Sequence, residues 1–87
     1  MSGKYFVYVS NSVKKSIKKI PQPWQSKILY ILTALETNPF LGIKMTGEKY
    51  YCRKIRIHPY RIIYTMNQKQ NSIEILETAR RGNVSYD

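Results

Sequence analysis

The stretch RKIRIHPYRIIYT, residues 53–65, alternates charged and aliphatic side chains on both sides of a single proline. Side chains of a β-strand alternate between its two faces, so Ile55 and Ile57 share one face. Lys54 and Arg56 share the other. The pattern therefore predicts two adjacent strands with an aliphatic face toward a core and a cationic face away from it.

The rest of the second half of the chain has the same extended character. Three runs rich in β-branched and aromatic residues are separated by His58-Pro59 and by the polar turn NQKQN. We expect them to form an antiparallel meander of three strands, over residues 50–57, 60–66 and 72–79.

The tight connection between the first two of these strands brings their cations together. Arg61 follows the connection closely and lies on the face that Lys54 and Arg56 occupy. We therefore expect the three cations to cluster on the open face of the sheet. Like charges so placed repel each other, and a phosphate group would relieve the repulsion because Arg offers a planar pair of donors to its oxygens. A solvated basic face is the alternative interpretation.

The first half of the chain predicts one strand and two helices. The segment KYFVYVS, residues 4–10, is short and rich in aromatic and β-branched residues, as strands are. Two apolar stripes at helical spacing follow, the first ending at Pro21 and the second running from Pro23 to Asn38. Their members are Val13, Ile17 and Ile20, and then Trp24, Ile28, Ile31, Leu32 and Leu35. We expect a two-helix hairpin on the sheet, with residues 39–47 as a loop.

Together these elements predict an α+β fold. An N-terminal strand and a two-helix hairpin pack with a small antiparallel sheet, in the order β-α-α-β-β-β. A chain of 87 residues has room for one domain, which we place at residues 1–87.

The composition indicates the kind of partner. Fifteen Lys and Arg residues face five Asp and Glu residues, which leaves a net charge of +10. Such an excess attracts nucleic acid, an anionic membrane surface or an acidic protein. The single cysteine, Cys52, excludes an internal disulfide framework and a Cys-based zinc site. No apolar run is long enough to cross a membrane and no secretory signal is visible, so we expect a soluble, cytoplasmic protein.

The segments NPF, MTGEKYYCRKIRIHPYRIIYTMNQ and IEILETARRGNV, within residues 38–84, carry a family resemblance. Their order and spacing resemble the RelE/ParE superfamily of bacterial toxins from type II toxin-antitoxin modules. Over the first 37 residues the resemblance is one of topology only. It implies that the chain is a toxin that inhibits translation or another essential process.

In the ribosome-dependent branch of that superfamily, similar positions bind and cleave messenger RNA without a metal or cofactor. The resemblance implies an endoribonuclease in which the 2′-hydroxyl attacks the adjacent phosphate. It gives catalytic roles to Lys54 and Arg56 as paired cations and to Arg61 as a phosphate clamp. Arg81 resembles the arginine of the terminal signature of the family, and Tyr86 its tyrosine.

The tail departs from the family pattern by one position. Ser85 stands where the tyrosine is expected, so Tyr86 reaches that place only by a shift of one residue. Lys54 and His58 are the other candidates for proton transfer. Further cations are expected to bind RNA, namely Lys14, Lys15, Lys18, Lys19, Lys44, Lys49 and Arg80.

The resemblance leaves other functions open. ParE-like members of the superfamily inhibit DNA gyrase and cleave no RNA, and a non-catalytic RNA-binding protein is a third interpretation. Messenger RNA and the ribosome, or gyrase, are the corresponding targets. Either toxin implies a cognate antitoxin, which we expect to be small and acidic because the charge of +10 attracts such a partner.

Overall fold

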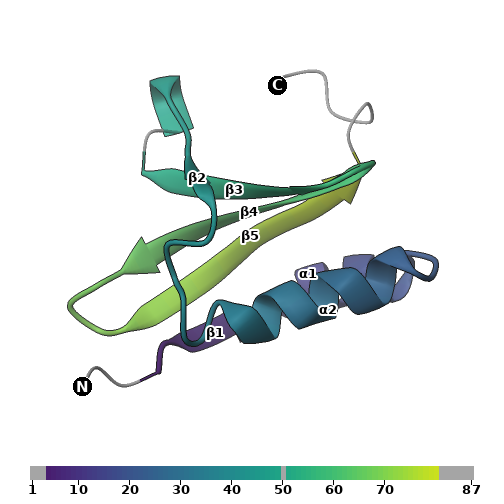
Figure 1. The fold of residues 1–87 in the computed structure, drawn as a ribbon, viewed down its shortest axis with the longest axis horizontal. Coiled ribbons are helices and arrows are strands. Elements are labelled where there is room, and N and C mark those ends of the chain that lie inside the picture. Colours follow the sequence, from purple (N-terminus) through teal and green to yellow (C-terminus); the bar gives the residue numbers. More distant parts are fainter. Residues whose placement is uncertain (1–3, 50, 81–87) are drawn as a thin grey trace.

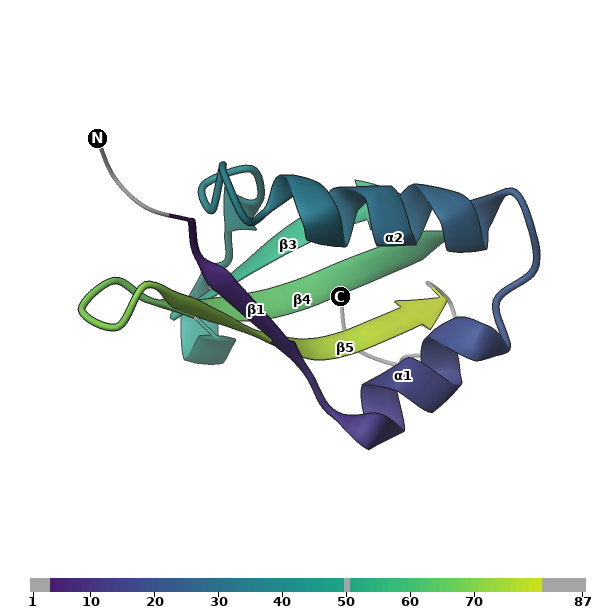
Figure 2. The same cartoon turned by 90° about the horizontal axis from the view of Figure 1, so that it is seen from below.

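The computed structural model describes residues 4–49 and 51–80. Two helices cover one face of a five-stranded sheet, and the other face lies away from them (Figures 1 and 2). The strand order across the sheet is β1-β5-β4-β3-β2. The elements are β1 (Phe6–Val9), α1 (Asn11–Lys18), α2 (Trp24–Ala34), β2 (Ile43–Lys44), the 3-10 turn η1 (Gly47–Lys49), β3 (Cys52–Ile57), β4 (Tyr60–Asn67) and β5 (Ser72–Arg80).

The α+β fold with a two-helix hairpin on a sheet is confirmed, and two details of the sheet differ from the prediction. β1 pairs in parallel with β5, so the sheet is mixed rather than wholly antiparallel. The predicted loop over residues 39–47 contains the two-residue strand β2, which pairs with Lys54 and Arg53 of β3. Neither difference can be predicted from local sequence, because each depends on which distant strand pairs with β1 or with residues 43 and 44.

The helices begin and pack as their apolar stripes predict. Ser10 caps α1, since its Oγ accepts a hydrogen bond from the Val13 amide at 3.3 Å. Val13 and Ile17 of α1 are buried, as are Ile28 and Leu32 of α2. Neither helix has the length and apolar content needed to span a membrane.

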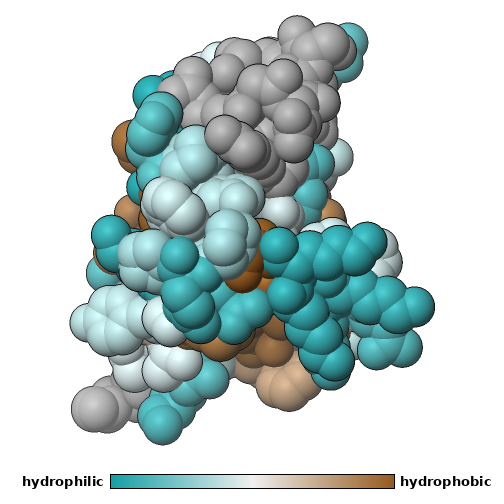
Figure 3. Space-filling view, turned by 90° about the vertical axis from the view of Figure 1, so that its right-hand side faces the viewer, coloured by the Kyte–Doolittle hydropathy of each residue, from teal (hydrophilic) through white to brown (hydrophobic). Residues whose placement is uncertain are grey.

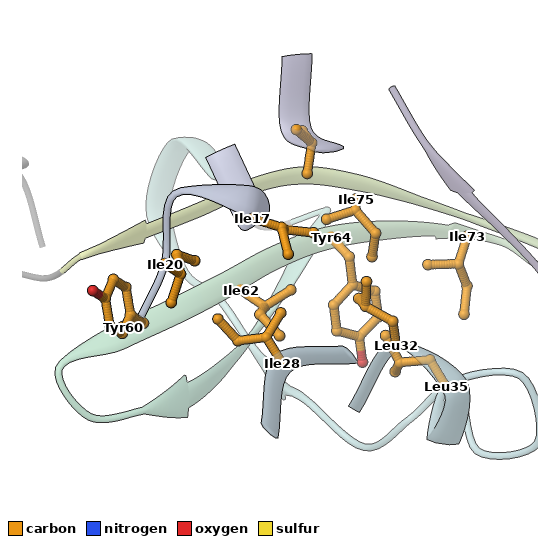
Figure 4. Packing of buried hydrophobic residues seen from close by; sticks show 11 residues of the cluster. Ile17, Ile20, Ile28, Leu32, Leu35, Tyr60, Ile62, Tyr64, Ile73 and Ile75 are labelled. Atoms are coloured by element: carbon orange, nitrogen blue, oxygen red, sulfur yellow. The ribbon is translucent and has the colours of Figure 1, made fainter. Parts of the chain in front are cut away.

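The core lies between the helices and the sheet (Figure 4). β4 contributes Ile62 and Tyr64, both fully buried, and β5 contributes Ile73 and Ile75. Full burial of one such side chain stabilises the fold by about 1.5–3 kcal/mol. A slip of one residue would turn these side chains to the far face and bring Arg61 into the core, so their burial fixes the register.

A hydrogen-bonded clamp joins the loop before β2 to the centre of the sheet. The Tyr64 hydroxyl accepts a hydrogen bond from the Gly42 amide at 2.9 Å and donates one to the Pro39 carbonyl at 2.8 Å. Nη1 of Arg53 donates to the Gly42 carbonyl at 2.7 Å. We call Pro39, Gly42, Arg53 and Tyr64 the Tyr64 clamp.

Only glycine fits position 42 of this clamp. A Cβ atom there would lie 2.8 Å from the Tyr64 hydroxyl oxygen and 2.9 Å from the carbonyl oxygen of Lys54. One of these contacts is with backbone, which cannot move aside without disturbing β3. The close approach of the loop to the sheet therefore depends on the missing side chain.

Replacing Tyr64 with Phe tests the clamp. The variant leaves the Gly42 amide and the Pro39 carbonyl buried without their partner. We expect the free energy of unfolding to fall by about 2–4 kcal/mol, since each buried polar group left unsatisfied costs about 1–3 kcal/mol. Urea denaturation measures the change. Tyr30→Phe is the control, because that side chain is 73% exposed, and equal midpoints for the two variants would contradict the clamp.

The same residue predicts a loss of stability in alkali. Burial raises the pKa of Tyr64, and the opposing effects of the Gly42 amide and of Arg53 are smaller. A tyrosine in the unfolded chain ionises near a pKa of about 10. The stability contributed by the neutral phenol is therefore complete below that pH and is lost as the pH rises toward the folded-state pKa. We expect denaturation midpoints between pH 9 and 11 to fall less steeply in Tyr64→Phe than in the parent.

Candidate functional site

The pairing of β3 with β4 places basic residues directly beside one another. Arg56 lies opposite Arg61, and Lys54 lies opposite Ile63 in the neighbouring row. Because Ile62 points into the core, these side chains emerge from the sheet face that the helices leave uncovered. We call Lys54, Arg56 and Arg61 the cation set.

The three cations differ sharply in exposure. Arg56 is exposed and Lys54 is half-buried, whereas only 2% of Arg61 is exposed. The expectation that all three lie on an open surface is therefore wrong for Arg61. A buried guanidinium is held in place by its surroundings, because desolvation makes any poorly partnered position costly. Arg61 is thus the fixed member of the cation set and Arg56 the accessible one.

A β-bulge adds a carboxylate to this face. The partners of Ile63 and Tyr64 on β5 are Glu77 and Ile75, so Leu76 is one residue too many for regular pairing. The additional residue exchanges the faces of everything that follows it in β5. Glu77 consequently lies on the face of the cation set, although uninterrupted alternation from Ile75 would have turned it inward.

Glu77 lies in the same cross-strand row as Lys54, and the next row on this face contains Arg56 and Arg61. Lys54, Ile63 and Glu77 are in register across three strands. Its negative charge lowers the repulsion among the cations at this short range. The sequence pattern gave no reason to choose Glu77, because a bulge cannot be located from one sequence.

The other residues predicted to bind RNA lie elsewhere. Lys14, Lys15, Lys18 and Lys19 are exposed on α1 and just beyond its end, on the side of the sheet opposite to the cation set. Figure 3 shows hydrophilic side chains on both sides of a hydrophobic strip at the end of the molecule where α1 and α2 are joined. The cations predicted to bind RNA are therefore divided between the two sides of the sheet.

The remaining predicted residues lie at or beyond the ends of elements. Lys44 is exposed on β2, Lys49 ends η1, and Arg80 ends β5 in register with Tyr60. The predictions for Arg81 and Tyr86 concern positions outside the described residues.

The aromatic side chains divide into buried and exposed groups. Tyr60 and Tyr64 belong to the core, and the ring of Tyr60 lies 6.0 Å from that of Trp24. Tyr51 and Phe40 are 58% and 50% exposed. The second pair is therefore accessible from the surface, as are Phe6, Tyr8 and Tyr30.

Other groups able to transfer protons or bind metals are few in the described part of the chain. His58 is exposed in the turn between β3 and β4. Among residues 4–49 and 51–80, no three His, Cys, Asp or Glu side chains gather closely enough to hold a metal ion.

The sequence matches the family model described as the ParE toxin of the type II toxin-antitoxin system parDE, over residues 7–84. That match spans most of the chain. The chain belongs to this ParE toxin family. It is therefore a toxin of a type II toxin-antitoxin system, and the predicted membership of the RelE/ParE superfamily is confirmed. No sequence among the curated proteins that we searched matches it significantly.

Solved structures show the same fold. A chain of the Mycobacterium tuberculosis RelBE2 toxin-antitoxin complex superposes with a TM-score of 0.79 at 19% identity, covering 90% of this chain and 99% of that one. The archaeal RelE-RelB complex from Pyrococcus horikoshii gives 0.73 at 26% identity, with 92% and 98% covered. The isolated Escherichia coli RelE toxin gives 0.76 at 14% identity, with 93% and 88% covered.

Neutralising Glu77 tests its place among the cations. In Glu77→Gln the repulsion within the cation set is no longer offset, so the melting temperature should fall by a few degrees at low salt, and the loss should shrink as salt screens the charges. The affinity for single-stranded RNA should rise over the same salt range. Glu74→Gln, an exposed acid on the same strand, is the control. A loss of stability that salt leaves unchanged would refute the electrostatic role.

Proposed function

We propose that this toxin is a metal-independent, ribosome-dependent mRNA endoribonuclease that inhibits translation. The observation that carries the proposal is the direct pairing of Arg56 with Arg61, with Lys54 in the adjacent row. One carboxylate, that of Glu77, lies with three cations on this face, so the cation set keeps a net positive charge that attracts an anion. A backbone phosphate of RNA is such an anion, and guanidinium groups match its oxygens.

The reaction needs only proton transfer and charge stabilisation. The 2′-oxygen forms a bond to the adjacent phosphorus and gives up its proton to a base. The bond from phosphorus to the 5′-oxygen breaks, and that oxygen takes a proton from an acid. The products are a 2′,3′-cyclic phosphate and a 5′-hydroxyl. In the transition state, the oxygens on the phosphorus carry additional negative charge.

The cation set supplies the charge stabilisation. Arg61 is buried beneath this face, so it supplies a fixed positive charge under the phosphate, and such charges need no rearrangement during the reaction. Arg56 and Lys54 are accessible enough to close around the phosphate from β3. Arg81 and Tyr86 remain the proposed further cation and proton-transfer group of the tail.

An acidic antitoxin is the proposed physiological partner. The M. tuberculosis and P. horikoshii relatives were solved as toxin-antitoxin complexes. A net charge of +10 would speed the encounter with an acidic chain and stabilise the complex. The cation set and the α1 lysines are both surfaces that such a chain could cover.

Inhibition of DNA gyrase is the alternative, and the match to a ParE family model favours it. One scaffold can support both activities, so the fold does not decide between them. The cation set favours cleavage, because a toxin that acts by binding gyrase has no need of cations opposed to each other at a phosphate site.

Removing the accessible arginine tests the proposal. In Arg56→Ala the cleavage of ribosome-bound mRNA should fall by about 100-fold, as happens when one donor to a developing oxyanion is removed. Arg56→Lys should recover part of the loss, since it restores charge without the planar pair of donors. Mapping of RNA 5′ ends after induction measures the effect. Arg61 is less suitable, because replacing a buried arginine would also change stability.

Lys4→Ala provides the matched control, because it removes an exposed cation that precedes β1, and two strands lie between β1 and β3 in the sheet. It should cleave like the parent. Growth arrest that persists in Arg56→Ala with no new RNA 5′ ends, together with gyrase-DNA adducts, would reject the nuclease and establish the alternative.

A further inference from the structure

A pocket on the helix-bearing side of the sheet lies apart from the cation set. It is a cavity of about 390 Å³ between the loop before β2 and the first residues of β3. Its walls include Phe40, Lys44, Tyr51, Arg53 and Gln68. Arg53 and Lys54 are consecutive residues of β3, so they project from opposite faces of the sheet. This pocket is therefore distinct from the proposed cleavage site.

The walls combine aromatic rings with positive charge. Phe40 and Tyr51 expose half or more of their surface, and Lys44 is exposed beside them. None of the described residues that line the pocket is acidic. Exposed rings next to cations are the features with which proteins bind single-stranded nucleic acid, since bases stack on the rings and phosphates bind the cations.

Contacts within the protein hold the walls of the pocket in place. The Arg53 guanidinium lies over the Phe40 ring, 5.1 Å from its centroid, and its Nη1 donates to the Gly42 carbonyl at 2.7 Å. The backbone of Tyr51 is held by a hydrogen bond from Thr65 Oγ1 at 3.2 Å. Groups fixed in this way lose little conformational entropy when a ligand binds.

Size and polarity fit one nucleotide. Ligand pockets commonly measure about 300–1,000 Å³, and this one falls at the lower end of that range. The Gln68 side chain offers both a donor and an acceptor to the edge of a base. An acidic peptide would also suit the cations, but it has no use for two exposed rings and an amide at the same point.

We propose that this pocket binds one nucleotide of single-stranded RNA, with the base on Tyr51 or Phe40 and the phosphate at Lys44 and Arg53. The inference rests on the proposed function, because it assumes that RNA is the target. It adds a second RNA contact on the face opposite the cleavage site. The nucleotide could come from messenger RNA or from an unpaired segment of ribosomal RNA, since both have the same chemistry.

Binding can be measured without cleavage. The probe is a fluorescent hexanucleotide of mixed sequence in which every ribose carries a 2′-O-methyl group, so that no attacking hydroxyl is present. Titration of the full-length toxin by anisotropy then reports affinity alone. Tyr51→Ala should weaken binding by about tenfold or more, as expected for the loss of one base-stacking ring. Tyr51→Phe, which keeps the ring, should bind like the parent.

The salt dependence of binding tests the phosphate contact separately. In Lys44→Gln, the slope of the logarithm of the binding constant against the logarithm of the salt concentration should become shallower by about 0.7, the value for one lost phosphate contact on a single strand. Tyr8→Ala is the control for Tyr51→Ala, because Tyr8 on β1 is an exposed ring outside the pocket. It should leave the affinity unchanged. Thermal melts should show that all variants are folded.

Ribosome binding distinguishes the two sources of the nucleotide. A loss of affinity of Tyr51→Ala for ribosomes without mRNA indicates ribosomal RNA, and a loss seen only with mRNA present indicates the message. If Tyr51→Ala and Lys44→Gln bind like the parent in every assay, the proposal that this pocket binds a nucleotide is wrong. A loss confined to antitoxin binding would also overturn it and mark a protein interface.

Failure of the pocket and failure of the nuclease give different results. A toxin that cleaves no mRNA but loses hexanucleotide affinity on Tyr51→Ala keeps the pocket and rejects only the nuclease. A toxin that cleaves mRNA and binds the hexanucleotide equally well with Ala at position 51 rejects only the pocket.

Discussion

The structure depends on the burial of alternate residues along β4. Ile62 and Tyr64 are sealed against the helices, and every neighbouring side chain must therefore point the other way. That constraint turns Arg61 outward and places it opposite Arg56 of β3. The repulsion between them is small compared with the cost of exposing the apolar side chains that fix the register. Burial of the core residues thus keeps the cation set together despite the electrostatic repulsion among its members.

The Tyr64 clamp extends this constraint to the edge of the sheet. Tyr64 belongs to the core, yet its hydroxyl holds the loop at Pro39 and Gly42. That loop leads into β2 and carries Phe40, on which Arg53 rests. One buried phenol therefore supports both the short edge strand and the wall of the second pocket, which links the stability of the fold to the shape of that pocket.

Local patterns in the sequence were sufficient for most of the fold. Strand alternation in residues 53–65 and the apolar stripes of α1 and α2 involve neighbours in sequence, and both are found in the structure. Features that depend on distant partners could not be predicted. The parallel pairing of β1 with β5, the bulge that turns Glu77 outward and the burial of Arg61 are of this kind. The role of Arg53 was missed because its partner, the Gly42 carbonyl, is set by tertiary structure.

The distribution of charge favours a toxin whose partners approach from more than one side. The cation set lies on one face of the sheet, and the α1 lysines and the Lys44 pocket lie on the other. Because these surfaces lie on opposite faces, a partner must reach around the sheet to contact all of them. A large RNA assembly that surrounds the toxin can neutralise both, as can an antitoxin that wraps around it. Because ligands that bind only the folded state stabilise it, either partner would also offset the repulsion that the isolated toxin carries.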